Sequence, residues 1–450
     1  MCTKRPESRV QAGDGELRIA RRIIKGLFGP VLARAFAVRY WDGSEERPSG
    51  KNVALTVVLR HPGALRRLLL PPSEIAAAEA YLRDEFDVEG DLEQLMGLVD
   101  LLTHTLQSPL RLARLVVLAA QLPALGAPRL NSRRVLPSGD AGRHLHTRAS
   151  DAISVRSHYD VGNDFYRLWL DDRLVYSCAY FPTGEEDLNA AQEAKLEHIC
   201  RKLRLRRGES LLDIGCGWGG LLLYAAEHYQ VRATGITLSA EQADLARERI
   251  AAAGLADRAT VEVRDYRDVA RDACYDKVVS IGMLEHVGRE KMREYFDAAY
   301  RVTRPGGTFL AHGIVDQSRA AARGVLVRAA GKLWGEGRFV EQYVFPDGEL
   351  LAPWELGRAA EQAGWEIRDA ENLREHYART LRHWVRRLEA HHDEAAAIVG
   401  EATYRVWRLY MSGSANGFAK GDLGVIQYVL SKRAPGGASR LPLTRADLYR

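Results

Sequence analysis

The most constraining feature of this sequence is a glycine-rich turn near the middle of the chain. Residues 211–220 read LLDIGCGWGG, an apolar strand that leads into a turn and then into a helical pattern from Trp218 to about Tyr229. A strand, a glycine turn and a helix in immediate succession form the ligand cradle of an open α/β sheet. Gly215 and Gly217 let the backbone approach a ligand closely, but the third glycine of the strict dinucleotide pattern is missing. The turn therefore favours S-adenosylmethionine over NAD, and a tight turn without a ligand is the competing interpretation.

Length and composition indicate a globular protein with more than one domain. The 450 residues suffice for two or three domains, and 46% of them are hydrophobic. The five cysteines are widely spaced and include no C-x-x-C pair, so neither a disulfide framework nor a zinc site is indicated, and a reducing cytoplasm fits best. Neither a signal peptide nor a membrane-spanning run is recognisable. The net charge of +5 permits an anionic partner, phospholipid or nucleic acid, without requiring one.

The first 105 residues predict a small α+β domain. Residues 14–28 alternate apolar side chains with Arg18, Arg21, Arg22 and Lys25, which is typical of a basic amphipathic helix. Such a helix either binds an anionic membrane surface or packs on its own domain, and the composition favours the packed helix. Strands are expected at 36–41 and 52–60, and helices at 62–70, 72–84 and 91–105.

A basic and apolar segment follows at 108–138, around the run LVVLAA at 115–120. This run is too short to cross a bilayer, so it predicts either a linker helix or an interfacial segment. Prolines and glycines at 123–142 interrupt regular structure, and we place a domain boundary between about 125 and 150. The expected division is an N-terminal α+β domain with its linker at 1–140, a second domain at 141–435 and a tail at 436–450.

Strand and helix patterns alternate through the second domain, which predicts a doubly wound α/β sheet. Seven strands are expected, at 210–214, 231–236, 260–264, 275–283, 307–311, 365–370 and 424–431. Helices are expected at 240–253, 289–302 and 353–363, with two more between about 375 and 412. This pattern is typical of a seven-stranded, Rossmann-like class I methyltransferase domain.

Polar residues follow the second and third strands, where ligands bind in such a sheet. The segment 237–239 reads TLS and lacks the acid with which a dinucleotide-binding fold holds the ribose. Ser239 and Gln242 have the spacing of a helix cap, a role that leaves Thr237 and Gln242 able to face a nucleoside. The segment 265–267 reads DYR, which places an acid beside a flat ring near an adenine, unless it is a solvated loop.

Groups that can exchange protons follow the next two strands. Glu285 and His286 come after the fourth strand and His312 after the fifth, at the edge where this architecture carries catalytic groups. A charged pair at a helix start can also be a cap. The spacing of these residues matches no metal-ligand set, so no metal is expected and a pocket for an anion or a proton is favoured.

Further motifs lie upstream of the glycine turn, HYDVGNDFY at 158–166 and YSCAYF at 176–181. QEAKL at 192–196, the glycine turn, the segments after the second, third and fourth strands, and Phe345-Pro346 complete a series in one order and spacing. From about His158 to Lys432 the sequence resembles the cyclopropane-fatty-acyl-phospholipid synthases and the related mycolic acid cyclopropane synthases.

The resemblance implies a transferase that moves a methyl group from S-adenosylmethionine to a cis double bond of a phospholipid acyl chain and then removes a proton to close a cyclopropane ring. Methylation of an alkene leaves a carbocation, which needs a dry pocket and a small anion that accepts its proton. In this family the anion is bicarbonate. The residues that the resemblance places around it are Cys178, Glu285, His312, Ile314 through its backbone, and Tyr377. Those expected around the cofactor are Tyr176, Ser177, Asp213, Gly215, Cys216, Gly217, Gly219, Thr237, Leu238, Gln242, Asp265, Tyr266 and Arg267.

Two features depart from the family pattern. Ser414 stands where many members carry a cysteine, so it is a weaker catalytic candidate. Residues 317–338 exceed the family's usual connection and carry Arg319, Arg323, Arg328 and Lys332 among apolar side chains. They predict either an amphipathic helix that docks on a membrane or a plain surface insertion.

The resemblance also sets expectations for partners and location. The N-terminal domain matches the family's lipid-associated domain in position and size, so it is expected to present lipid or to form a homodimer. The protein is expected at the inner face of a membrane, bound through its basic segments to anionic lipid. A nucleic-acid substrate is not expected, because no Asn/Asp-Pro-Pro-Tyr motif is present. Two alternatives stay open, a methylene- or methyl-branched product and a lipid-binding protein without catalysis.

Overall fold

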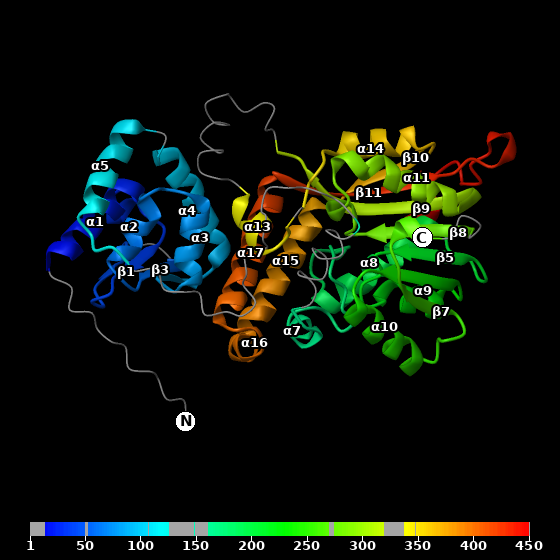
Figure 1. Ribbon diagram of the computed structural model, residues 1–450, viewed down its shortest axis with the longest axis horizontal. Helices are drawn as coiled ribbons and strands as arrows, with labels where there is room; N and C mark the ends of the chain where they lie inside the picture. The colour runs from blue at the N-terminus through cyan, green and yellow to red at the C-terminus, as the bar shows by residue number, and fades with distance from the viewer. Residues whose placement is uncertain are drawn as a thin grey trace. The chain divides into compact units, whose positions relative to one another are not determined.

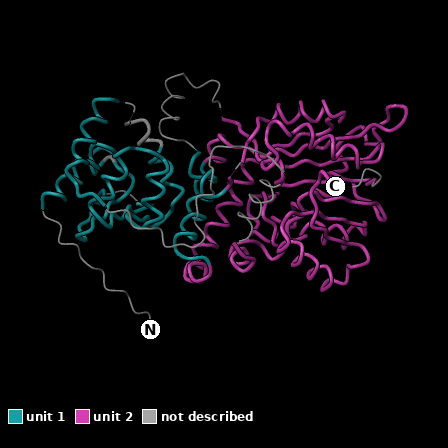
Figure 2. Tube along the Cα trace, in the orientation of Figure 1, with its two compact units in different colours: residues 1–138, 320–344, 399–416 teal, residues 139–319, 345–398, 417–450 magenta. Residues whose placement is uncertain are grey.

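The protein consists of two compact units, which are coloured in Figure 2. The computed structural model describes residues 14–49, 53–106, 108–125, 148, 161–269, 274–318, 337–346 and 348–449. Unit 1 comprises Met1–Ser138, Ala320–Val344 and Val399–Asn416, and unit 2 comprises Gly139–Arg319, Phe345–Ile398 and Gly417–Arg450. Most of the predicted insertion at 317–338 therefore lies outside the described residues, and so do His158, Tyr159 and Asp160 of the first family motif.

Unit 1 is an α+β domain, as predicted, with a sheet in the order β2-β1-β3-β4. β1 and β3 are parallel, and the other neighbours are antiparallel. Its strands are β1 (Ala37–Arg39), β2 (Glu45–Glu46), β3 (Leu55–Leu59) and β4 (Phe86–Gly90). Its helices are α1 (Asp14–Phe28), α2 (Gly63–Leu69), α3 (Glu74–Leu82), α4 (Leu92–Leu106), α5 (Pro109–Ala120), α13 (Arg338–Tyr343) and the first part of α17 (Glu401–Lys420). The sequence patterns miss β2 and β4, which are edge strands containing acidic residues.

The apolar face of α1 is buried inside unit 1. Ala20, Ile23, Ile24 and Leu27 are buried, and the helix packs against α4 and α5. The structure therefore confirms the packed amphipathic helix and leaves only its basic face for an anionic surface. The apolar run at 115–120 lies in α5, which also packs within this unit. Among the described residues, no helix is both long enough and apolar enough to cross a bilayer.

Unit 2 is the predicted doubly wound α/β sheet of seven strands, in the order β10-β11-β9-β8-β5-β6-β7. Only β11 runs antiparallel to its neighbours. The strands are β5 (Ser210–Ile214), β6 (Arg232–Thr237), β7 (Ala259–Val263), β8 (Tyr275–Ile281), β9 (Thr303–Asp316), β10 (Glu366–Asn372) and β11 (Leu423–Ser431). The helices are α7 (Asn163–Arg167), α8 (Leu188–Leu203), α9 (Gly220–His228), α10 (Ala240–Ala252), α11 (Met292–Val302), α14 (Pro353–Gln362), α15 (Arg374–Ala390) and α16 (His392–Val399).

Two hydrophobic cores lie on the two faces of this sheet. Side chains such as Leu212 and Phe309 pack on one face against α11 and α14. Their strand neighbours Leu211 and Leu310 point to the other face and pack against α8 and α9. Figure 1 shows α11 and α14 on one side of the sheet and α8, α9 and α10 on the other. The carboxyl ends of β5, β6 and β8 consequently meet at one edge, at the switch point where ligands bind.

Two predictions about unit 2 are wrong. Three helices, α15, α16 and α17, replace the two expected between 375 and 412, since Gly400 with φ of +85° interrupts the run between α16 and α17. The fifth strand runs to Asp316 rather than ending at 311, because β9 goes on pairing with β11 beyond its pairing with β8. His312 therefore lies inside a strand, where its side-chain direction is fixed.

Gly235 is expected to be essential for packing the glycine turn against β6. A Cβ atom there would lie 2.4 Å from Leu222 Cδ1 and 2.7 Å from Cys216 Sγ, so Gly235→Ala is expected to destabilise unit 2 by about 1–3 kcal/mol. Urea unfolding measures the loss, and hydrogen exchange of peptides from the seven-stranded sheet assigns it to unit 2. Gly97→Ala in α4 is the control, because its Cβ meets nothing within 4 Å. Equal stability of the two variants would contradict the prediction.

Candidate active site

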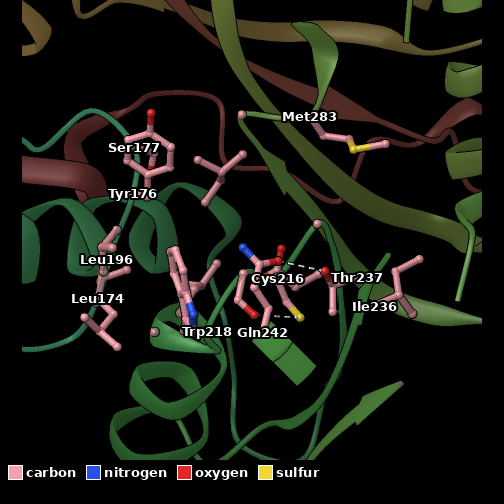
Figure 3. A pocket seen from close by; sticks show the side chains of 18 of the residues that line it. Leu174, Tyr176, Ser177, Leu196, Cys216, Trp218, Ile236, Thr237, Gln242 and Met283 are labelled. Carbon is pink, nitrogen blue, oxygen red and sulfur yellow. Dashed lines mark hydrogen bonds between the residues drawn. The ribbon is translucent and has the colours of Figure 1, made fainter. Parts of the chain in front are cut away.

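A cavity lies at the carboxyl ends of β5, β6 and β8. It encloses about 910 Å³ when the space open to solvent is counted. Nine of the residues expected around the cofactor line it, and Figure 3 shows it from close by. These residues are Tyr176, Ser177, Asp213, Gly215, Cys216, Gly217, Thr237, Leu238 and Gln242. The structure thus brings together segments before the sheet, at the glycine turn and after β6.

The glycine turn has the backbone that the sequence predicts. Gly215 and Gly217 have φ of +86° and +53°, conformations that other residues rarely adopt. The amides of Gly215 and Cys216 both donate to the carbonyl of Ile236, which ties the turn to β6. The turn therefore presents backbone rather than side chains to the cavity.

Two buried charged side chains of opposite sign line the cavity. Burial raises the pKa of Asp213 to about 7, against the opposing influence of Lys195, and lowers the pKa of Lys195 to about 8. Lys195 Nζ donates to Ser177 Oγ at 2.9 Å. Among the described residues, Asp213 Oδ1 has no hydrogen-bond partner although it is buried. A buried carboxylate oxygen without a donor beside an ammonium group suits a ligand that carries both an amino group and a carboxylate.

Thr237 and Gln242 combine a structural and a lining role. Ser239 Oγ accepts from the Gln242 amide at 3.3 Å, which confirms the predicted cap of α10. Thr237 Oγ1 donates to Gln242 Oε1 at 2.8 Å, a contact drawn in Figure 3. This bond fixes the side-chain amide of Gln242 with its oxygen toward Thr237.

Four of the expected cofactor residues do not line the cavity. The carboxylate of Asp265 binds Arg267 at 2.6 and 2.8 Å, and Tyr266 packs against Tyr295 with ring centroids 5.2 Å apart. Gly219 lies in the turn directly before α9, where its φ of +78° is a left-handed conformation that favours glycine. The segment 265–267 follows β7 beside Thr237, so its contact with a cofactor stays a prediction.

Glu285 and His312 lie at the same edge of the sheet. Glu285 Oε1 accepts from the Ile314 amide at 2.6 Å, and Oε2 is buried without a partner among the described residues. Burial raises the pKa of Glu285 to about 7, against the opposing hydrogen bond from Ile314. His312 and Ile314 are two residues apart in β9, so both point to the same face. Burial, together with the charges of Lys195 and Lys202, lowers the pKa of His312 to about 3.

Cys178 and the backbone amide of Tyr377 contact the same backbone carbonyl. Cys178 Sγ contacts Leu373 O at 3.7 Å, and the Tyr377 amide donates to the same oxygen at 3.1 Å. Cys178 is fully buried, and burial raises the pKa of its thiol well above the ordinary value. The side chain is therefore a neutral thiol and not a thiolate nucleophile. Ser414 belongs to the part of α17 in unit 1, so its place in the site stays a prediction.

Several buried polar residues near the site were missed by the sequence reasoning. α8 turns Gln192, Lys195, His198 and Lys202 inward, although such residues belong to a solvated face in most helices. Their spacing of three to four residues along an otherwise apolar stripe was the available signal. Glu371 and Gln427 gave no such signal, because only the strand register brings them beside His312.

Comparison with known proteins identifies the family. The family model described as mycolic acid cyclopropane synthetase matches residues 146–428, and a domain of unknown function matches 23–104. A probable fatty acid methyltransferase of Pseudomonas putida is 38% identical over 413 residues, which are 92% of this chain and 96% of that protein. The cyclopropane-fatty-acyl-phospholipid synthase of Escherichia coli is 35% identical over 294 residues, 65% of this chain and 72% of that protein.

A solved structure supports the same assignment. A mycolic acid cyclopropane synthase complexed with SAH and CTAB has a TM-score of 0.59 and 32% identity, and covers 62% of this chain and 97% of its own. The seven-stranded fold, the cavity at the glycine turn and these matches agree with one another. The chain belongs to the mycolic acid cyclopropane synthetase family and is an S-adenosylmethionine-dependent methyltransferase.

Proposed function

We propose that this enzyme methylates the cis double bond of an unsaturated phospholipid acyl chain and closes a cyclopropane ring. The alkene would form a bond to the methyl carbon of S-adenosylmethionine as the bond from that carbon to sulfur breaks. S-adenosylhomocysteine would leave with the electron pair on sulfur, and a carbocation would result at the second alkene carbon. Loss of one proton from the transferred methyl group supplies the electron pair that closes the ring, so the net change is one added CH2.

The observation that carries this proposal is the pair of Glu285 and His312. A buried carboxyl group has one oxygen on a backbone amide and the other without a partner among the described residues. The imidazole, two residues before that amide in β9, is held neutral. These groups fit a small anion that is itself both donor and acceptor of hydrogen bonds. A nucleophilic residue is not needed, which agrees with the neutral thiol of Cys178.

Bicarbonate fits these residues, and when bound it would supply a weak base inside a dry pocket. Glu285 Oε2 and the imidazole of His312 would hold it, with Tyr377 completing the site. The amide of Ile314, assigned to the same anion by the resemblance, donates to Glu285 here. Glu285 would therefore orient the anion through Oε2. Because its pKa is raised to about 7, its carboxyl group would be charged above that pH and neutral below it.

For S-adenosylmethionine, the residues at the glycine turn have separate tasks. Asp213 would accept a hydrogen bond from the amino group of the methionine moiety, and Lys195 with Ser177 would lie on the side of its carboxylate. Thr237 and Gln242 would face the nucleoside after β6. Methylation places positive charge on the substrate, so exclusion of water by the buried walls is part of the chemistry.

A methyl- or methylene-branched acyl product is the second candidate. It shares the first step and differs only in the carbon that loses the proton. The relative from Pseudomonas putida is named a probable fatty acid methyltransferase, and this name is compatible with a branched acyl product. A lipid-binding protein without catalysis would have no need for the buried Glu285 and His312 at the edge of the sheet where the cavity lies. We further propose that the enzyme binds to an anionic membrane surface and forms a homodimer.

Cells that contain monounsaturated phospholipids distinguish these candidates when the protein is expressed in them. We expect acyl chains with one added CH2 by mass spectrometry and upfield cyclopropyl protons by NMR. Vinylidene or branched methyl signals would support the second candidate, and unchanged lipids would contradict both.

Glu285→Gln tests the assigned role of the carboxyl group within the same assay. The amide keeps the shape of the side chain but neither ionises nor carries a carboxylic proton, so product should fall by about 100-fold or more. Binding of S-adenosylhomocysteine, followed by calorimetry, should stay unchanged. Loss of both would mean that Glu285 belongs to the cofactor site.

Asp213→Asn is expected to weaken binding of S-adenosylhomocysteine by about 10- to 100-fold, the cost of a hydrogen bond to a charged group. The pKa of Asp213 is raised to about 7, so its charge is present above that pH and lost below it. Affinity of the parent protein should therefore rise from about pH 6 to about pH 7.5, and that of the variant should not. Asp244→Asn in α10 is the control, since its carboxylate is exposed and binds Arg247 at 2.8 Å. An equal loss in both variants would contradict the assignment to Asp213.

A further inference from the structure

Three polar side chains form a row across neighbouring strands of unit 2. Glu371 in β10 is the register partner of Gln427 in β11, and Gln427 is the register partner of His312 in β9. Register partners project to the same face of a sheet, so the three side chains lie side by side. His198 and Lys202, one turn apart in α8, contact this row from above the face. Gln427, Lys202 and His312 are almost fully buried, so these groups are shielded from bulk solvent.

The hydrogen bonds in this row have a fixed direction. Lys202 Nζ donates to Gln427 Oε1 at 2.9 Å, and an ammonium group can only donate. The oxygen of the Gln427 amide must therefore face Lys202, and its NH2 group faces the other way. Gln427 Nε2 lies 3.0 Å from His312 Nδ1. Because the NH2 group donates, Nδ1 must accept and carries no proton.

We propose that Lys202 and Gln427 are positioning residues that hold His312 as the neutral tautomer with its proton on Nε2. Protonation of Nδ1 would place two donors against each other at 3.0 Å. The charges around the imidazole act in the same sense. Burial lowers its pKa, Lys195, Lys202 and His198 lower it further, and Glu371 opposes them.

Glu371 is the nearer of two carboxylates that pair with Lys202 among the described residues, the other being Asp369. It accepts from Lys202 Nζ, and its Oε2 lies 2.7 Å from His198 Nε2. Burial alone would raise the pKa of Glu371, but the contacts with His198 and Lys202 outweigh it and lower the pKa to about 2. Without this carboxylate, Lys202 would keep the more distant Asp369, whose Oδ2 lies 3.4 Å from Nζ, and the buried cation would be less well compensated.

The catalytic consequence rests on the proposed function. A neutral Nε2–H group donates a hydrogen bond to the base without giving up its proton. An imidazolium at that place would protonate the base and remove it from the reaction. The row thus keeps His312 as a neutral hydrogen-bond donor that positions the base. The base stays able to accept the proton of the methylated acyl chain.

Gln427→Glu tests the inference directly. A carboxylate keeps the contact with Lys202 but can only accept from His312, so the proton should move to Nδ1 and the pKa of His312 should rise. Histidine-labelled protein, followed by two-bond nitrogen to proton NMR, reports which ring nitrogen carries the proton. The His312 signals are assigned by their loss in His312→Gln. We expect Nε2–H without titration in the parent protein, and Nδ1–H with a titration near neutral pH in Gln427→Glu.

The control is Gln362→Glu, the same substitution at an exposed position, which should leave the His312 signals unchanged. Nδ1–H in the parent protein, or an unchanged tautomer in Gln427→Glu, would overturn the inference. If Gln427→Glu does not fold, Lys202→Met with Glu371→Gln removes both charges, and a mixture of tautomers is then expected. A parent-like single tautomer in that variant would also overturn it.

Kinetics separate this inference from the proposed function. Gln427→Glu should lower kcat by about 10- to 100-fold, as is typical for groups that orient a catalytic ligand, with the KM for S-adenosylmethionine unchanged. Its activity should also fall more steeply towards low pH than that of the parent, because His312 then titrates in addition to Asp213 and Glu285. If the tautomers are as expected but no variant, including the parent, forms product, the assignment of His312 stands and the proposed function fails.

Discussion

The burial of two ammonium groups by α8 is the constraint on which the site depends. Lys195 and Lys202 are seven residues apart in α8 and therefore lie on the same face of the helix. Both are almost fully buried against the sheet. Removing such a cation from water costs several kcal/mol unless it is paired and hydrogen-bonded. The surrounding sequence supplies the partners. Lys195 has Ser177 and nearby Asp171 and Asp213, and Lys202 has Glu371, Asp369 and Gln427. The loss of a carboxylate from either set would leave the buried ammonium group less well compensated.

The same helix connects the cofactor cavity to the catalytic residues. Gln192 donates to the carbonyls of Val175 and Ser177 at 3.2 and 2.9 Å, which fixes the segment that lines the cavity. That segment continues to Cys178, and the amide of Ala179 donates to Thr380 in α15 at 3.0 Å. Since α15 also carries Tyr377, one buried face of α8 sets the distance between the methyl donor site and the groups proposed to handle the proton.

The sequence predicts the parts of this structure that depend on local pattern. The glycine turn, the seven strands and the cap at Ser239 follow from spacing over a few residues, and all three are present. The predicted length of the fifth strand was wrong, because the length of β9 depends on its pairing with β11, more than 100 residues later. Glu371, Gln427 and His312 meet for the same reason, through register between strands that sequence patterns do not reveal. The position of His312 after a predicted strand identified it as a candidate residue. Its protonation state could not be predicted, because it depends on neighbours that only the folded structure brings together.

The balance of charge explains why so many ionisable groups can surround the proposed reaction. A carbocation is destabilised by any unpaired cation nearby, and Lys195 and Lys202 are buried here together with His198 and His312. Lys202 is paired with Glu371, Lys195 lies within the influence of Asp213, and His312 is neutral. Glu285, with its pKa raised to about 7, is the acid whose charge still responds to conditions near neutrality. A developing positive charge on the acyl chain would therefore meet compensated groups and one carboxyl that gains negative charge as the pH rises.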